Sequence, residues 1–199
     1  MLPPPTVAAV FYFDLRSPQA YLAAERALAV LPGPCEWQPV LSARLGGAER
    51  FEVFRCEQER LALLESVERR AAALSLQPLR WPDPFPFDSE LAMLTATFAK
   101  RIGKAVAFAL AAFRQAYAGG RALSDPDSVL IAAAACEMHP AAILRATATR
   151  GLRDELERAT AAAAAAGVSD VPAVRVGDRV LVGERLLEEA GALLAAVRR

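Results

Sequence analysis

The chain has few of the residues that most often carry enzyme chemistry. Its 199 residues include three cysteines (Cys35, Cys56 and Cys136) and one histidine, His139. The cysteines are odd in number, far apart and never spaced as C-x-x-C, so we expect free thiols rather than a disulfide framework or a metal site. Pro140 follows His139, and this pairing favours a helix start over a catalytic base.

A surplus of charge and a long apolar run are also missing. Lys+Arg and Asp+Glu number 23 each, so the formal net charge is zero and nothing indicates nucleic-acid binding. Residues 1–6 have no basic segment followed by an apolar run, and no later stretch is long enough to span a bilayer. Dinucleotide and P-loop motifs are absent as well. We therefore expect a cytoplasmic protein whose partners include neither nucleic acid nor a membrane.

The first informative stretch is a strand that leads directly into a helix. Residues 7–15 form an apolar, aromatic run of strand length, and alanine- and leucine-rich residues 19–31 follow Ser17-Pro18. Ser17 suits the N-cap and Pro18 the first helical turn. An ordinary helix start explains this pair, but its free N–H groups would also favour a bound anion or thiolate.

The rest of the chain predicts an α/β fold with a helical middle. Residues 35–41 resemble a second, parallel strand, whereas residues 42–166 carry mostly helical patterns. Two short strands joined by Gly177-Asp178 and a last helix then close the chain. This order looks like a thioredoxin-like fold, formed by residues 7–41 and 167–199, with a large all-helical insertion at residues 42–166.

Both ends of the chain resemble one family. Residues 13–22, Phe-Asp-Leu-Arg-Ser-Pro-Gln-Ala-Tyr-Leu, are similar to the start of 2-hydroxychromene-2-carboxylate isomerases and kappa-class glutathione transferases, within the DsbA-like group. The segments around Val171-Pro172 and Glu184-Arg185 resemble that family's tail. The resemblance implies glutathione as cofactor, a small aromatic or conjugated substrate and a catalytic Ser17 that stabilises the glutathione thiolate. A homodimer is left open.

The resemblance also implies the other site residues. The Val171-Pro172 bond is expected to be cis, which lets Val171 pair with an extended peptide such as glutathione, although most X-Pro bonds are trans. The start of the last helix would bind the γ-glutamyl end, through Gly183, Glu184 and Arg185. The substrate pocket would be aromatic, and its candidates are Phe13, Trp81 and Phe85, although burial as loop anchors is the favoured explanation for Trp81 and Phe85.

The chain also departs from the family. The Asn and Lys that usually contact glutathione in the middle of the chain are missing, and Arg44 or Arg50 is the candidate replacement. Residues 17–20 contain no sulfur, which excludes thiol–disulfide exchange at this helix start. Three hypotheses remain: a glutathione-dependent isomerase, a kappa-type glutathione transferase or peroxidase, and a non-catalytic thioredoxin-like binding protein.

Overall fold

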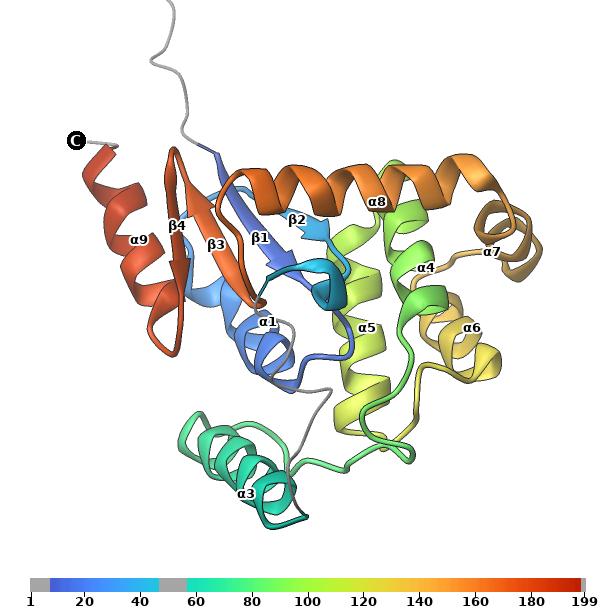
Figure 1. Cartoon of the computed structure of the whole chain (residues 1–199), viewed down its shortest axis with the longest axis horizontal. Coiled ribbons are helices and arrows are strands. Elements are labelled where there is room, and N and C mark those ends of the chain that lie inside the picture. Colours follow the sequence, from blue (N-terminus) through green and yellow to red (C-terminus); the bar gives the residue numbers. More distant parts are fainter. Residues whose placement is uncertain (1–7, 47–56, 198–199) are drawn as a thin grey trace, which may run out of the picture.

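The computed structural model describes residues 8–46 and 57–197, so Arg50 and Cys56 lie outside the described residues. Four strands form one mixed sheet in the order β2-β1-β3-β4: β1 (Ala9–Phe13), β2 (Cys35–Pro39), β3 (Ala173–Val176) and β4 (Arg179–Val182). β1 pairs with β2 in parallel, and the other two pairings are antiparallel. Figure 1 shows α9 (Leu186–Val197) beside β4 and most of the other helices beyond β2.

The helical segment lies between β2 and β3 in the sequence. After the 3₁₀ turn η1 (Ser42–Arg44), the described residues 57–165 form six helices and no strand. They are α3 (Glu57–Ala73), α4 (Glu90–Arg101), α5 (Ala105–Tyr117), α6 (Pro126–Ala134), α7 (Pro140–Thr147) and α8 (Arg150–Ala165). The thioredoxin-like arrangement with a helical insertion is therefore confirmed, while the exact domain bounds stay a prediction.

β1 is a central strand covered on both faces, as its unbroken apolar sequence predicts. Alternate side chains point to opposite faces of a sheet. Ala9, Phe11 and Phe13 accordingly join the large core with α1 (Pro18–Val30), α4, α5 and α9. Val10 and Tyr12 join a smaller cluster with residues from α8 and the segment before β3. All five residues of β1 are buried.

Helix boundaries follow the capping residues. The Ser17, Asp125 and His139 side chains each accept a backbone N–H in the first turn of the helix that follows, and a proline occupies the start of all three helices. His139 is thus a helix cap, as its Pro140 neighbour predicts. The alanine run 161–166 largely belongs to α8, and Gly167 follows it with a φ of +90°, which suits glycine at a helix end.

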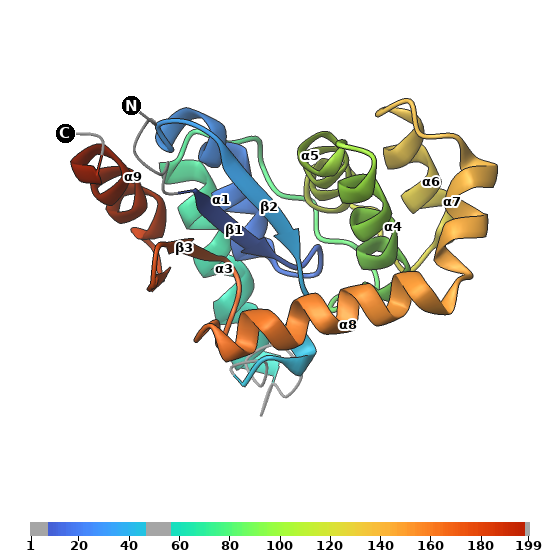
Figure 2. The same ribbon diagram turned by 90° about the horizontal axis from the view of Figure 1, so that it is seen from above.

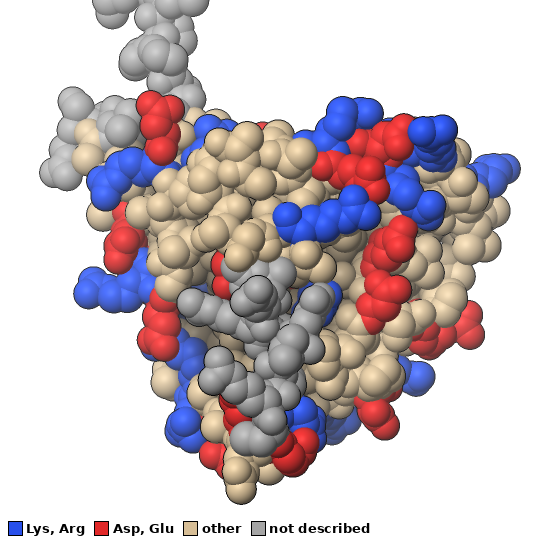
Figure 3. All heavy atoms as spheres, viewed as in Figure 1, with Lys and Arg blue, Asp and Glu red and all other residues tan. Residues whose placement is uncertain are grey.

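α8 runs from the sheet to α7 across one side of the molecule in both ribbon views (Figures 1 and 2). Its outer surface carries ion pairs with α4: Arg101 with Glu155, and Arg153 with Glu90. On the face shown in Figure 3, Lys and Arg lie among Asp and Glu over the part of this helix nearer α7, whereas the part nearer the sheet is uncharged. Exposed pairs of this kind contribute little to stability.

Candidate functional site

Three segments far apart in the sequence meet at one edge of the sheet. α1 begins just after β1, Pro172 immediately precedes β3, and Gly183 immediately follows β4. The strand register brings these points together, because Tyr12 at the end of β1 pairs with Ala173, and Ala173 pairs with Val182. The predicted residues Ser17, Val171 and Gly183 therefore lie at the same edge.

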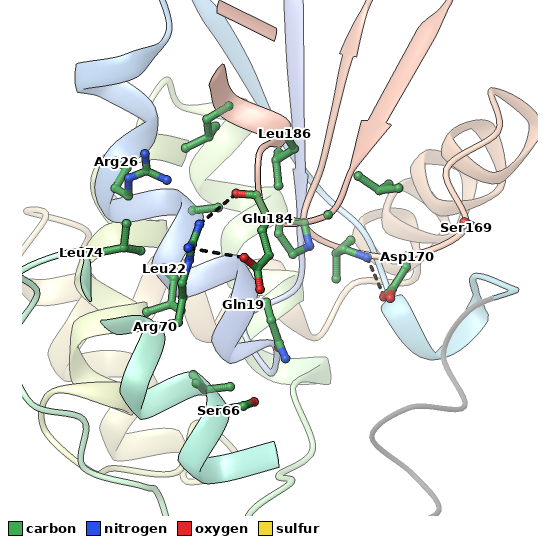
Figure 4. Close-up of a pocket in the computed structure, with 17 residues that line it drawn as sticks. Gln19, Leu22, Arg26, Ser66, Arg70, Leu74, Ser169, Asp170, Glu184 and Leu186 are labelled. Atoms are coloured by element: carbon green, nitrogen blue, oxygen red, sulfur yellow. Dashed lines mark hydrogen bonds and ion pairs between the residues drawn. The ribbon is translucent and has the colours of Figure 1, made fainter. Parts of the chain in front are cut away.

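A cleft of about 500 Å³ opens at this edge. Its volume lies in the range of small-molecule sites, about 300–1,000 Å³. α1 and α3 line one side, and residues 169–172 together with the β4–α9 turn line the other (Figure 4). Among the predicted residues, Val171, Pro172, Gly183 and Glu184 line the cleft, whereas Arg185 is exposed and lies outside its lining.

Ser17 caps α1 and contacts Val171, which lines the cleft. Its Oγ accepts the Ala20 N–H at 3.1 Å and is 3.5 Å from the Val171 carbonyl oxygen. The hydroxyl proton therefore has one long, weak acceptor. Ser17 is 1% exposed and is not part of the cleft lining, while Gln19, in the same turn of α1, lines the cleft.

A buried aspartate holds the loop that positions Ser17. Asp14 is 1% exposed, and its carboxylate accepts from the Ser42 N–H at 2.9 Å, from the Ser42 hydroxyl at 2.8 Å and from the Ser89 hydroxyl at 2.8 Å. The same carboxylate accepts the Arg16 N–H at 3.1 Å. Asp14 thus connects the β1–α1 loop to η1 and to the start of α4. In the sequence, Asp14 stands out only as part of the motif at residues 13–22, and nothing there identifies Ser42 or Ser89 as its hydrogen-bond partners.

The Val171-Pro172 peptide bond is cis, as the resemblance implies. Both backbone groups of Val171 already have partners inside the protein. Its N–H donates to Asp170 Oδ1 at 2.7 Å, and its carbonyl is the one that faces Ser17 Oγ at 3.5 Å. Asp170 itself lines the cleft.

The β4–α9 turn is joined to α3 by an arginine that sequence reasoning missed. Arg70 lies 3.4 Å from the Glu184 carboxylate and donates to the Glu184 carbonyl oxygen at 3.3 Å. Glu184, predicted to bind a γ-glutamyl group, is thus paired with a cation of the protein itself. On the sequence, Arg70 is one of several charged residues in an amphipathic helix, so no signal distinguishes it.

Two further polar residues of the cleft were also missed. Arg26 pairs with Glu188, and this ion pair lowers the pKa of the Glu188 carboxyl while it joins α1 to α9. Gln19 Oε1 is buried and has no hydrogen-bond partner among the described residues. An unpaired buried acceptor favours a ligand that donates an N–H to it.

The predicted aromatic residues do not line the cleft. Phe13 is fully buried and packs against Trp37 and Phe113 at ring-centroid distances of 5.9 and 6.0 Å, so it belongs to the core and not to a substrate pocket. Trp81 and Phe85 are half-buried and contact each other, with their ring centroids 4.9 Å apart. Trp81 Nε1 donates to Glu68 of α3 at 2.6 Å, which anchors the loop to that helix.

The described cysteines lie away from the cleft. Cys35 begins β2 and pairs with Ala9, at the opposite end of β1 from Ser17. Burial raises the pKa of the Cys35 thiol to about 11, and burial also raises the pKa of Cys136. Both are thus poor nucleophiles at neutral pH. Arg44, a candidate for the missing glutathione contact, pairs with Glu157 at 3.0 Å.

This arrangement, a helix start and a cis-proline at one edge of a mixed sheet, agrees with comparisons to known proteins. The model of the DSBA-like thioredoxin domain matches residues 8–194. The chain belongs to this DSBA-like thioredoxin family. No curated protein sequence matches it significantly.

Solved structures support the same family fold. A 2-hydroxychromene-2-carboxylate isomerase matches with a TM-score of 0.82 and 20% identity, over 96% of each chain. A probable DsbA oxidoreductase from Streptomyces coelicolor matches with a TM-score of 0.77 and 18% identity, over 96% of this chain and 90% of the other. The cytosolic disulfide reductase DsbM from Pseudomonas aeruginosa, solved with GSH, matches with a TM-score of 0.61 and 16% identity, over 96% of this chain and 98% of the other. These identities support the fold alone.

Within residues 8–46 and 57–197, His, Cys, Asp and Glu side chains form no cluster that could hold a metal ion. In the same ranges no helix has the length and apolar character needed to cross a bilayer.

Proposed function

We propose that this protein is a glutathione-dependent isomerase, similar in activity to 2-hydroxychromene-2-carboxylate isomerase, with Ser17 as the residue that stabilises the glutathione thiolate. The observation that carries the proposal is the position of Ser17 Oγ, at the start of α1 and 3.5 Å from the backbone of Val171. Thioredoxin-like disulfide reductases have a cysteine at this helix start. Here a hydroxyl occupies it, so the sulfur must come from a bound thiol.

The residues present fit glutathione in part. The cleft is large enough for a small peptide, Gln19 Oε1 offers an unpaired acceptor for an amide N–H, and Arg26 and Arg70 suit carboxylates. Their present ion pairs with Glu188 and Glu184 are partly exposed, so an incoming carboxylate can exchange with them at small cost. The fit is weakest at Val171, where Asp170 already holds the N–H.

Bound glutathione would supply a nucleophilic sulfur that adds to a conjugated carbon of the substrate. This addition would permit ring opening and bond rotation in the substrate, after which the sulfur would be expelled. The chain's own part is to hold that sulfur ionised. Ser17 Oγ accepts the Ala20 N–H, which leaves its proton available to donate toward the sulfur. The positive end of the α1 dipole favours the same negative charge. Since Ser17 is 1% exposed, the side chains around it must part when a thiol binds.

The test is glutathione titration by calorimetry, combined with the pKa of the bound thiol from ultraviolet thiolate absorbance. In the wild type we expect binding with a lowered thiol pKa. Ser17→Ala should return that pKa toward its free value, and Ser17→Thr, which keeps a capping hydroxyl, should retain most of the effect. Ser66→Ala is the matched control, because Ser66 lines the cleft but bonds only its own helix at Leu63.

Two outcomes would contradict the proposal. No binding at millimolar glutathione would favour a thioredoxin-like binding protein without this cofactor. Binding with an unchanged thiol pKa in Ser17→Ala would remove the catalytic role from Ser17. If the wild type binds glutathione with a lowered thiol pKa, turnover of a chromene carboxylate separates an isomerase from a transferase, because only the transferase leaves glutathione attached to the product.

A further inference from the structure

Val171 is the point at which a peptide-like ligand would pair with this protein. An extended peptide binds beside an exposed backbone segment by matching its own carbonyl and N–H to those of the protein. Val171 immediately precedes the cis-proline, lines the cleft and has its carbonyl next to Ser17. A ligand whose sulfur reaches Ser17 therefore passes along the Val171 backbone.

The two backbone groups of Val171 are not equally available. The carbonyl has a contact of 3.5 Å with Ser17 Oγ, which is at the long limit for a hydrogen bond. The N–H donates to Asp170 Oδ1 at 2.7 Å, a short bond to a carboxylate. Hydrogen bonds to ionised acceptors are about twice as strong as neutral ones. A ligand carbonyl, which is neutral, must therefore displace a stronger acceptor.

We propose that Asp170 is a specificity-determining residue of this cleft, whose carboxylate competes with the ligand's carbonyl for the Val171 N–H. The inference rests on the proposed function, because it concerns the same ligand and the same edge of the sheet. The Asp170 side chain must turn away from Val171 before a glutathione-like peptide can pair with both the N–H and the carbonyl of Val171. The ligands least affected are those that engage Ser17 and the Val171 carbonyl without needing the N–H.

The charge of Asp170 strengthens its bond to the Val171 N–H, because an ionised carboxylate is a stronger acceptor than a neutral carbonyl or amide oxygen. A neutral side chain at this position would hold the same N–H less firmly.

Two substitutions separate these effects. Asp170→Asn removes the charge but keeps an oxygen that can accept the Val171 N–H, whereas Asp170→Ala removes both. We expect Asp170→Ala to bind glutathione about three- to tenfold more tightly than the wild type, which corresponds to one hydrogen bond no longer in competition. The glutathione affinity of Asp170→Asn should lie between those of the wild type and Asp170→Ala. Asp178→Ala is the control, because it makes the same charge change at the exposed β3–β4 turn, at the other end of both strands.

A second measurement needs no ligand. In the ligand-free protein, the Val171 amide hydrogen should exchange with solvent faster in Asp170→Ala than in the wild type, because its acceptor is gone. Equal glutathione affinity in the wild type and both Asp170 variants would overturn this inference and leave the proposed function intact. Binding only by Asp170→Ala would support it. Absence of binding in all variants would overturn the inference and the proposed function together.

Discussion

At the scale of single residues, the site depends on hydrogen bonds that link distant segments. Ser17 is in contact with Val171, 154 positions further along the chain. Asp14 connects the loop before Ser17 to Ser42 and Ser89. The serine motif was predictable, since an N-cap followed by proline is a local signal. The partners of Asp14 were not, because nothing local in the sequence shows which hydroxyl groups the fold brings to a buried carboxylate.

Asp14 provides a prediction on stability. Asp14→Ala removes the acceptor of one buried N–H and two buried hydroxyl groups, so we expect the free energy of unfolding to fall by about 2–4 kcal/mol. Urea denaturation followed by circular dichroism measures the change. Asp178→Ala, at an exposed turn, is the control and should shift the midpoint little. An equally small shift for both variants would show that the Asp14 network contributes nothing to folding.

At the scale of elements, the cleft exists because helices are held against the sheet edge from two directions. The Arg26–Glu188 pair connects α1 to α9, and Arg70 connects α3 to the β4–α9 turn. The helices themselves were predictable from caps and apolar spacing. Their pairing was not, because an arginine on an amphipathic helix looks the same in the sequence whether it faces solvent or a neighbouring helix.

The Glu188 carboxyl gives a pH-dependent prediction. Arg26 lowers its pKa in the folded state, so its stabilising effect is present above the unfolded-state pKa and is lost as the pH falls through the folded-state pKa. We expect Glu188→Gln to lower the free energy of unfolding by less than about 1 kcal/mol at pH 7, since the ion pair is partly exposed. The difference from the wild type should shrink as the pH falls from 7 into the acid range. Urea unfolding at a series of pH values measures it, and a difference that grows toward acid would contradict this assignment.

At the scale of the whole molecule, one core runs from the sheet into the inserted helices. Phe13 of β1, Tyr21 of α1 and Tyr117 of α5 all pack against Phe113, at ring-centroid distances of 6.0 to 6.4 Å. The thioredoxin-like part and the helical segment therefore share buried surface, and we expect them to unfold together.

Phe113→Ala tests this shared core. Phe113 is fully buried, so its truncation should lower the free energy of unfolding by about 3–5 kcal/mol. Because the core is continuous, near- and far-ultraviolet circular dichroism should report one coincident transition in the wild type and in the variant. Two separate transitions would instead show that the helical segment folds as an independent domain.

The sequence by itself determined the elements and their kind: the strand–helix start at Ser17-Pro18, the helical middle, the hairpin with its Gly177-Asp178 turn, and the absence of a redox pair at the helix start. These features follow from capping, periodicity and composition, which act over a few residues. Only the tertiary structure decided that Phe13 belongs to the core, that Arg70 pairs with Glu184, and that Asp170 holds the Val171 N–H. Burial and pairing depend on which segments the strand register brings together, and that information is not local to any of these residues.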